Sequence, residues 1–499
     1  MNASPSFALL ANATALPWAE VPQWAPGELA ERTAEALDRG ARLCAWFGVP
    51  LAGAGGRGGE VGLLCVVAFD SDNTLGIAHS GPVRGGYPAL TPRHAEAHLF
   101  ERELFEQHGV RPEGHPWLKP VRRVSGGAPA NAPFFRVEGR EVHEVGVGPV
   151  HAGIIEPGHF RFQCAGEEVL QLEISLGYQH RGLEEAAAGG PHRATVSQME
   201  AAAGDTTIGH ATAHAMLMEA LCGAEAPLRA QWLRSLALEL ERLANHTGDL
   251  GALAGDVAFL PTASACGRIR GDFLNLTAAL CGNRFGRGLV RPGGCRLDAD
   301  EGRLTGVLGR LATALAEADR AIAWLWDAAS VRARFENVGT LTVRQASDLG
   351  IVGLAARACG LVRDVRFDHP AGWYRLAQLP VCVWPGGDVF ARARVRGLEI
   401  QRSAHFLAEQ IAAGPEGPVS EPPGRPAAST VAVALVEGWR GEVCHVGLTG
   451  PDGRLLRYKI VDPSFHNWSG LAMALRGQAI SDFPICNKSF NLSYCGFDL

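Results

Sequence analysis

A segment rich in glycine, alanine and proline, SGGAPANAPFF (125–135), separates two parts of the chain that differ in their residue patterns. A chain of 499 residues exceeds what one hydrophobic core usually supports, so we expect two domains. Proline and glycine interrupt helices and strands, which favours a linker at this segment. We therefore predict an N-terminal domain over 1–124, a linker over 125–144 and a C-terminal domain over 145–499.

The N-terminal part combines helical patterns with a buried strand. Residues 26–47 carry apolar side chains at helical spacing, and EVGLLCVVAF (60–69) is an apolar run typical of a buried strand. An acidic amphipathic helix is expected over 92–108, followed by an irregular loop rich in glycine and proline. This alternation indicates a small α/β domain.

The C-terminal part changes from strand-like to helical patterns and back again. Short strand-like runs alternate with turns over 141–174, and apolar residues recur at helical spacing from about 196 to 335. A loop rich in proline and glycine (412–430) precedes a β-like stretch, VAVALVEGWRGEVCHVGLTG. We expect an α+β fold, in which the small α/β domain is followed by a mainly helical domain with β segments at its start and end.

Composition narrows the class of protein. The hydrophobic share of 47% and the charged share of 20% are those of a globular protein. A formal net charge of -6, without a concentrated basic run, argues against a nucleic-acid partner. The first residues lack the basic start of a signal peptide, and no apolar run approaches the roughly 18 residues of a spanning helix. We expect a cytoplasmic protein that contacts a membrane only through partners.

The twelve cysteines are expected to be free thiols, because disulfide frameworks belong to short secreted chains. No two of them have the C-x-x-C spacing with which two thiolates bind one metal from a single turn. The spacing alone therefore predicts no metal site.

Several motifs together indicate a family. ERELFEQHGVRPEGHPWLKPVRR (101–123) resembles the C-type subunit of complex I. GPVHAGIIEPGHFRF (148–162) and EEVLQLEISLGYQHRGLEE (167–185) resemble the N-terminal signature of the D-type subunit of complex I and of nickel-iron hydrogenase large subunits, with GHFRF closest to the formate hydrogenlyase type. Further matches follow in the family's order: RPGG (291–294), LGIVG (349–353), DVFARARVRGLEIQRS (388–403) and VDPSFHNWSGLAMALRGQAISDFP (461–484). The resemblance covers nearly the whole chain, in an arrangement that fuses the C-type and D-type sequences.

This resemblance implies a peripheral-arm large subunit of a membrane-associated respiratory or energy-converting oxidoreductase complex, active only within that complex. The implied partners are a small iron-sulfur subunit like the B-type subunit of complex I, a ferredoxin-like subunit and antiporter-like membrane subunits. Electrons would pass from the iron-sulfur cluster in the partner toward a quinone-like or other acceptor, coupled to proton or ion movement. The alternatives are a nonenzymatic scaffold of such a complex and, as a third interpretation, an active nickel-iron hydrogenase.

The resemblance also bears on cofactors. A nickel-iron site needs four thiolates, but the family's first ligand motif falls on AGDT and its second on FNLSYC. Ala203, Thr206 and Leu492 therefore stand where three cysteines would be, and only Cys495 remains, which disfavours nickel. A quinone is possible, although Gly204 occupies the position of the family's quinone-binding tyrosine. The counterpart of its histidine is either His151 or His159.

The remaining polar groups are candidates for proton handling. Glu156 resembles the glutamate of the hydrogenase E-G-H turn, which passes protons, and a buried glutamate can be tuned for that role. Its alternative is an exposed turn carboxylate. His159 and Arg161 lie two apart on a strand and would face the same way, either into the cavity or to orient the turn. Asp205 lies between the vacated ligand positions, where with Thr206 and Thr207 it would make a polar pocket.

We thus predict catalytic roles for Glu156, His159 and Asp205. Cofactor contacts are expected from the remaining candidates, His151, Arg161, His180 and Thr206. His180, in YQHRGLEE, would line the cavity or else cap the following helix. His210 and His214 lie four apart on one helix face, as zinc ligands can, but without an evident third ligand a hydrogen-bonded buried pair is the better expectation.

Overall fold

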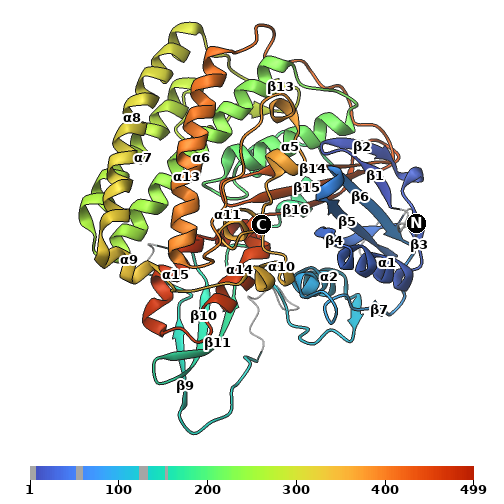
Figure 1. Ribbon diagram of the computed structural model, residues 1–499. Coiled ribbons are helices and arrows are strands. Elements are labelled where there is room, and N and C mark those ends of the chain that lie inside the picture. Colours follow the sequence, from blue (N-terminus) through green and yellow to red (C-terminus); the bar gives the residue numbers. More distant parts are fainter. Residues whose placement is uncertain (1–6, 52–59, 123–132, 152–154) are drawn as a thin grey trace.

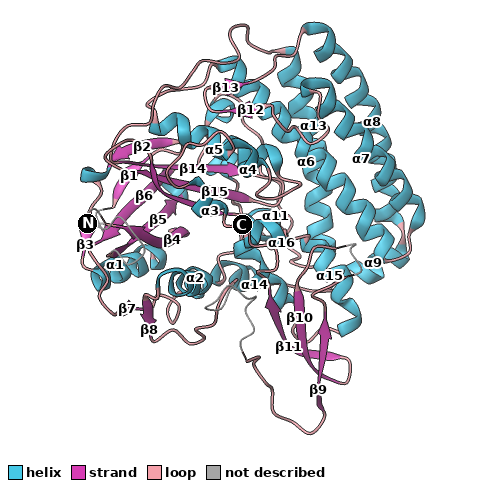
Figure 2. Ribbon diagram, turned by 180° about the vertical axis from the view of Figure 1, so that it is seen from behind, coloured by secondary structure: helices cyan, strands magenta, loops and turns pink. Residues whose placement is uncertain are grey.

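The structure is a computed structural model that describes residues 7–51, 60–122, 133–151 and 155–499. Residues 125–132 of the predicted linker lie outside the described residues. Strands and helices are mixed as the α+β prediction requires, with strands in the N-terminal part and long helices later in the chain (Figure 2).

The N-terminal part is built on a five-stranded sheet of order β1-β6-β5-β4, with β3 parallel to β6. The strand predicted at 60–69 is β5. The expectation of one helix over 26–47 is wrong, because the helix ends at Asp38 and the chain continues as strand β4, which pairs with β5. Apolar spacing cannot separate a helix from a strand buried on both faces, and β4 is buried along almost all of its length. The elements are β1 (Ala8–Leu10), β2 (Thr14–Pro17), η1 (Trp18–Glu20), β3 (Gln23–Trp24), α1 (Pro26–Asp38), β4 (Arg42–Pro50), β5 (Val61–Phe69), η2 (Asp70–Asp72), β6 (Thr74–Ser80), β7 (Gly86–Pro88), η3 (Ala95–Ala97), α2 (His98–His108) and β8 (Arg111–Glu113).

A second sheet joins the two ends of the chain. Its order is β16-β15-β14-β2, so that β2 from the N-terminal part pairs antiparallel with β14 (Thr430–Glu437) from the C-terminal part. The valine-rich β14 and β15 (Glu442–Thr449) are buried throughout, as expected for strands covered on both faces. One hydrophobic core contains Trp46 and Leu64 as well as Val433 and Trp468. The predicted boundary near residue 125 therefore divides a continuous core and remains a prediction.

The helical body lies beside this sheet. Four long helices, α6, α7, α8 and α13, pack side by side on the left of Figure 1, and α5 lies against β14 and β15. Helices α5 to α8 confirm the helical expectation for 196–335. Among the described residues, no helix has the length and apolar content needed to cross a membrane. The elements of this body are α3 (Leu183–Ala187), α4 (Thr195–Glu200), α5 (Thr207–Leu221), α6 (Leu228–Asp256), α7 (Leu260–Cys281), β12 (Val290–Arg291), β13 (Gly294–Cys295), α8 (Glu301–Asp327), α9 (Ala329–Phe335), α10 (Val343–Asp348), α11 (Gly353–Arg357), α12 (Val365–Asp368), η4 (Gly372–Arg375) and α13 (Val389–Ala412).

A small sheet projects from the lower end of the molecule in Figure 1. It has the order β11-β10-β9 and confirms the strand-like pattern of 141–174. The final helices of the chain pack between this sheet and the helical body. The remaining elements are β9 (Val142–Val147), β10 (His159–Ala165), β11 (Glu168–Ser175), β16 (Leu455–Val461), α14 (Pro463–Ala474), η5 (Ile480–Asp482), α15 (Phe483–Phe490) and α16 (Tyr494–Asp498).

Candidate functional site

The loop over 203–206, where the family's first ligand motif falls, forms a bidentate ion pair through Asp205. Asp205 precedes helix α5, and Arg440 lies in the turn between β14 and β15. Nη1 and Nη2 of Arg440 lie 2.5 and 2.7 Å from the two carboxylate oxygens of Asp205. The arginine side chain is 4% exposed and the aspartate 36% exposed. Bidentate pairing of this kind fixes geometry as well as charge, so the loop is held in one position.

Neighbouring groups hold the pair in place. The Nε–H of Arg440 donates to the carbonyl oxygen of Asn491 at 2.5 Å, and its guanidinium lies 4.0 Å from the ring centroid of Trp439. Trp439 Nε1 and Asn245 Nδ2 each donate to the carbonyl oxygen of Asp205 at 2.9 Å. The position of this pair is thus set by three separate parts of the chain, including the segment that carries Cys495.

Cys495 lies between this loop and Glu156. Burial raises the pKa of the Cys495 thiol to about 11, and the charge and hydrogen bond of Glu156 act in the same direction. The backbone N–H of Tyr494 donates to Glu156 Oε2 at 3.3 Å, and a backbone contact links Cys495 to Gly204. Glu156 is half-buried. The structure therefore brings Glu156 and the 203–206 loop to the two sides of Cys495.

A buried carboxylate, Glu241, lies beneath the same loop and was not identified from the sequence. It accepts hydrogen bonds from the backbone N–H groups of Ile208 at 2.7 Å and Gly209 at 3.2 Å, in the first turn of α5. Burial raises its pKa to about 8, and the charge of Asp205 adds to that rise. Glu241 stands four residues before Asn245 in an ordinary helical pattern, so nothing in the sequence distinguished it as a site residue.

The candidates on the small sheet make contacts of their own. His151 and His159 form hydrogen bonds with backbone carbonyl oxygens, of Gly158 at 2.9 Å and Gly148 at 3.1 Å respectively. Arg161 pairs with Glu144 on the neighbouring strand. The imidazole of His159 and the guanidinium of Arg161 both contact Phe134, so they lie on one face as the alternation predicted.

His180 lies at the end of the chain. Its Nδ1–H donates to the carbonyl oxygen of Asp498 at 2.7 Å. Arg181, beside it, donates to the carbonyl oxygens of Ala202 and Cys495 at 2.9 and 2.8 Å. These contacts join the last turn of the chain to Ala202, directly before the 203–206 loop, and so help to position both segments.

The two histidines of α5 belong to a buried hydrogen-bonded chain. Nε2 of His210 lies 3.0 Å from Asp462, and its Nδ1 lies 3.0 Å from Nε2 of His445. The hydroxyl of Tyr458 lies 2.8 Å from a ring nitrogen of His445 and 2.8 Å from one of His214. Both α5 histidines are thus hydrogen-bonded in the core, as we expected over a zinc site.

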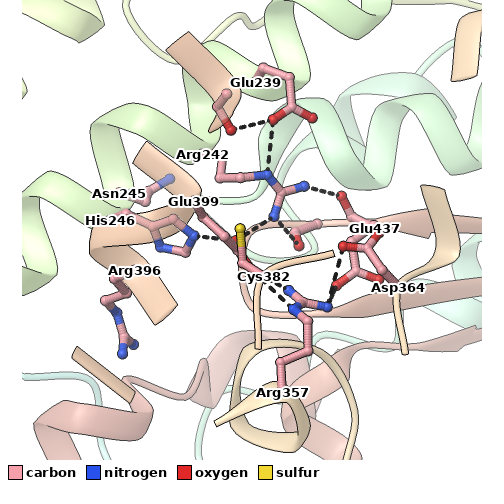
Figure 3. Close-up of polar contacts among 12 residues, drawn as sticks. Glu239, Arg242, Asn245, His246, Arg357, Asp364, Cys382, Arg396, Glu399 and Glu437 are labelled. Carbon is pink, nitrogen blue, oxygen red and sulfur yellow. Dashed lines mark hydrogen bonds and ion pairs between the residues drawn. The ribbon is translucent and has the colours of Figure 1, made fainter. Parts of the chain in front are cut away.

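Behind the site, arginines of the helical body meet carboxylates in a network without solvent access (Figure 3). Arg357 lies 2.8 Å from Glu399 and 2.7 Å from Glu437. Arg242 contacts the same Glu399, which also accepts a hydrogen bond from His246 at 2.8 Å. Arg357 and the other partners of Glu399 overcome the effect of its burial and hold the pKa of this carboxylate well below its usual range. Buried charges are tolerated when paired in this way, so the network fixes α6, α13 and β14 relative to each other.

The side chains at the family's ligand positions do not meet the requirements of a nickel-iron centre. Within the described ranges, no group of three or more histidine, cysteine, aspartate or glutamate side chains is placed to hold a metal ion. The ligand positions carry alanine, threonine, leucine and one thiol, and Asp205 is already engaged by Arg440. These residues do not fit four-thiolate coordination of nickel.

Comparison with known proteins identifies the family. Residues 256–430 match the family model described as respiratory-chain NADH dehydrogenase, 49 Kd subunit. The chain is 30% identical over 352 residues to the carbon monoxide-induced hydrogenase of Rhodospirillum rubrum, covering 70% of this chain and 97% of that protein. It is 29% identical over 433 residues to formate hydrogenlyase subunit 5 of Escherichia coli, covering 82% and 76%.

A relative from a respiratory complex matches a similar share of the chain. NADH-quinone oxidoreductase subunit 4 of Thermus thermophilus is 27% identical over 369 residues, covering 68% of this chain and 90% of that protein. Together with the fold, these matches confirm the resemblance found in the motifs. The chain belongs to the family of the D-type subunits of complex I and the related hydrogenase large subunits, and is a subunit of an oxidoreductase complex.

Proposed function

We propose that this chain is the peripheral-arm subunit at which electrons from an iron-sulfur partner reach a quinone-like acceptor. The observation that carries the proposal is the assembly of Glu156, Cys495 and the Asp205–Arg440 pair from distant parts of the sequence. Reduction of a quinone takes two electrons and two protons. The N–H groups of Arg440 would stabilise negative charge that develops on an acceptor oxygen, and Glu156 would deliver protons.

The other predicted residues have subordinate roles in this proposal. His159 would act with Glu156 as a proton carrier, and His151 and Arg161 would line the approach from the small sheet. Thr206 would contact the acceptor beside Asp205, since its hydroxyl lies 3.3 Å from Arg440 Nη1. His180 would position the chain end that carries Cys495.

The partners are proposed from the exposed surface next to Glu156. Val150 is 82% exposed and Ile155 is 52% exposed, so two apolar side chains face solvent beside a polar site. We assign this surface to a small iron-sulfur subunit. A ferredoxin-like subunit and antiporter-like membrane subunits would complete a complex at the inner face of the cell membrane, which this chain would reach only through them.

A nonenzymatic scaffold is the second candidate. The observation that favours it is the internal pairing of Asp205 with Arg440, because two side chains that satisfy each other leave little charge for a substrate. In this case the subunit would transmit conformational change between its partners without passing electrons.

The test is quinone reduction by the intact purified complex, with Glu156→Gln and Asp205→Asn variants. We expect each substitution to lower kcat at least tenfold, since Glu156→Gln removes the proton donor and Asp205→Asn removes the carboxylate that holds Arg440 in position. Asp298→Asn, in a surface pair with Arg229, is the control and leaves turnover unchanged. Wild-type turnover in both site variants would favour the scaffold. Stoichiometric nickel in the complex would instead establish the hydrogenase.

A further inference from the structure

Asn491 lies directly after helix α15 and contacts Arg440 of the site. It caps the end of the helix in the left-handed conformation, with φ 46° and ψ 54°. Apart from glycine, asparagine and aspartate are the residues that adopt this conformation most readily. In this conformation the carbonyl oxygen of Asn491 accepts a hydrogen bond of 2.5 Å from the Nε–H of Arg440.

The side chain of Asn491 is bound at both of its polar atoms. Its Nδ2 donates to Asp249 Oδ1 in α6 at 2.6 Å, and its Oδ1 accepts a hydrogen bond from Lys488 Nζ at 3.2 Å. The other carboxylate oxygen of Asp249 accepts a hydrogen bond of 2.9 Å from Arg396 Nε in α13. Asp249 and Arg396 are 4% and 1% exposed. Asn491 therefore connects Arg440 to two long helices of the helical body.

The guanidinium of Arg440 is held at its end, at its side and on its face. Asp205 pairs with Nη1 and Nη2 at the end, Asn491 accepts from Nε at the side, and Trp439 covers the face. A guanidinium is planar and its N–H groups form a rigid fork, so contacts at the end and the side fix the directions of all of them. Asp205 belongs to a loop and is 36% exposed, whereas Asn491 is anchored to a buried carboxylate, that of Asp249.

We propose that Asn491 is the positioning residue that directs Arg440 toward the acceptor. This inference rests on the proposed function, in which the N–H groups of Arg440 stabilise negative charge that develops on an acceptor oxygen. Stabilisation of that kind requires donors that are already in place where the charge develops. Without the hydrogen bond to Asp249, the carbonyl oxygen of Asn491 and the guanidinium bound to it can shift, and a displacement of about 1 Å can lower a rate about 100-fold.

The test is quinone reduction by the intact purified complex that carries Asn491→Gly. Glycine keeps the left-handed turn and the carbonyl oxygen but removes the amide that binds Asp249. We expect kcat to fall about tenfold and KM to change less than about twofold, because Arg440 acts on charge that appears in the transition state. Wild-type kcat in this variant, in a complex that loses turnover with Arg440→Met, would overturn the inference.

The matched control is Asn73→Gly. Asn73 also caps a helical turn in the left-handed conformation, with φ 52°, but it lies after η2 in the N-terminal part. The same substitution there should leave both kcat and KM unchanged.

Two combinations of variants separate positioning from a general loss of structure. In an Arg440→Met background, Asn491→Gly should lower kcat no further, because its effect passes through the arginine. Asn491→Asp should lower kcat, since it places a second carboxylate beside Asp249. Adding Asp249→Asn should restore kcat, because an amide and a carboxylate then face each other again with their positions exchanged. An equal loss from Asn491→Gly in both backgrounds, or no recovery in the exchanged pair, would overturn the inference.

A measurement that needs no turnover distinguishes this inference from the proposed function. The coupling between Asp205 and Arg440, from a double-mutant cycle in urea unfolding, should fall by about half or more in Asn491→Gly. An unchanged coupling would overturn the positioning role. A reduced coupling, in a complex whose quinone turnover does not respond to Arg440→Met, would confirm that Asn491 positions Arg440 and would refute the proposed function instead.

Discussion

The Asp205–Arg440 pair makes a quantitative prediction about stability. Replacing Asp205 with Asn removes the carboxylate but leaves the arginine cation 4% exposed, beside one carbonyl oxygen, the Thr206 hydroxyl and the face of Trp439. Exposed ion pairs contribute about 0.2–1 kcal/mol, whereas removal of one partner of a buried pair costs about 3–5 kcal/mol. Because Asp205 is about one-third exposed, we expect an intermediate loss of about 2 kcal/mol in the free energy of unfolding.

A double-mutant cycle isolates the interaction between the two side chains. Asp205→Asn, Arg440→Met and the double variant are unfolded in urea, and the coupling free energy is expected to be about 1–2 kcal/mol. The pair of Arg229 and Asp298 serves as comparison, since its members are 14% and 44% exposed and lie 2.9 Å apart. If the Asp205–Arg440 coupling does not exceed that of this surface pair, the pair is not the fixed element of the site that we describe.

Three further predictions concern single groups. Glu156→Gln should lower the pKa of Cys495 below about 11 and speed its alkylation by iodoacetamide about threefold. The alkylation rate is measured by peptide mass spectrometry across pH. An unchanged rate would show that Glu156 does not act on the Cys495 thiol. The pKa of Glu241 is about 8 in the folded protein and about 4.3 in the unfolded chain, so the folded state binds more protons between these two pH values. The free energy of unfolding therefore falls as pH rises through this range, by at most about 1.4 kcal/mol per pH unit. Glu241→Gln should remove this decline in urea unfolding between pH 5 and 8, and the same slope in both proteins would contradict it. Gly177→Ala should lower the free energy of unfolding by more than about 2 kcal/mol, because Gly177 has φ +100° and an added Cβ would lie 2.1 Å from the carbonyl oxygen of Arg122. Gly40→Ala is the control and should cost about 1 kcal/mol, because Gly40 has a similar φ of +93° but open space around it. Equal melting temperatures of the two variants would refute the clash.

The sequence predicted the parts of the fold that depend on local pattern. The strand at 60–69, the helices after residue 196 and the loop at 412–430 follow from apolar spacing and from glycine and proline. Residues 42–47 were misassigned to a helix, because a strand buried on both faces has no alternation to distinguish it from a helix. Local sequence patterns also could not predict the pairing of β2 with β14, because it depends on contact between opposite ends of the chain.

The site was predictable only where a family motif marked it. Glu156, Asp205 and Cys495 lie in motifs, but Arg440 was interpreted simply as part of an apolar strand-like stretch. Its signal was present in VEGWRGEV, where Arg440 follows Trp439 between two glycines and is flanked by Glu437 and Glu442. A charge in such a place needs a buried partner, yet the sequence could not say which of many carboxylates supplies it.

The N-terminal part also contributes to the site, although none of its described residues lies there. Arg122 donates two hydrogen bonds, of 2.9 and 2.6 Å, to the carbonyl oxygen of Phe497, and the Asp498 carboxylate accepts one from the backbone N–H of Gly177 at 2.7 Å. The last turn of the chain, which carries Cys495, is therefore held between the N-terminal part and the residues that follow β11 of the small sheet. Since that turn borders both Glu156 and the 203–206 loop, fusion of the two parts in one chain fixes the spacing on which proton delivery to an acceptor would depend.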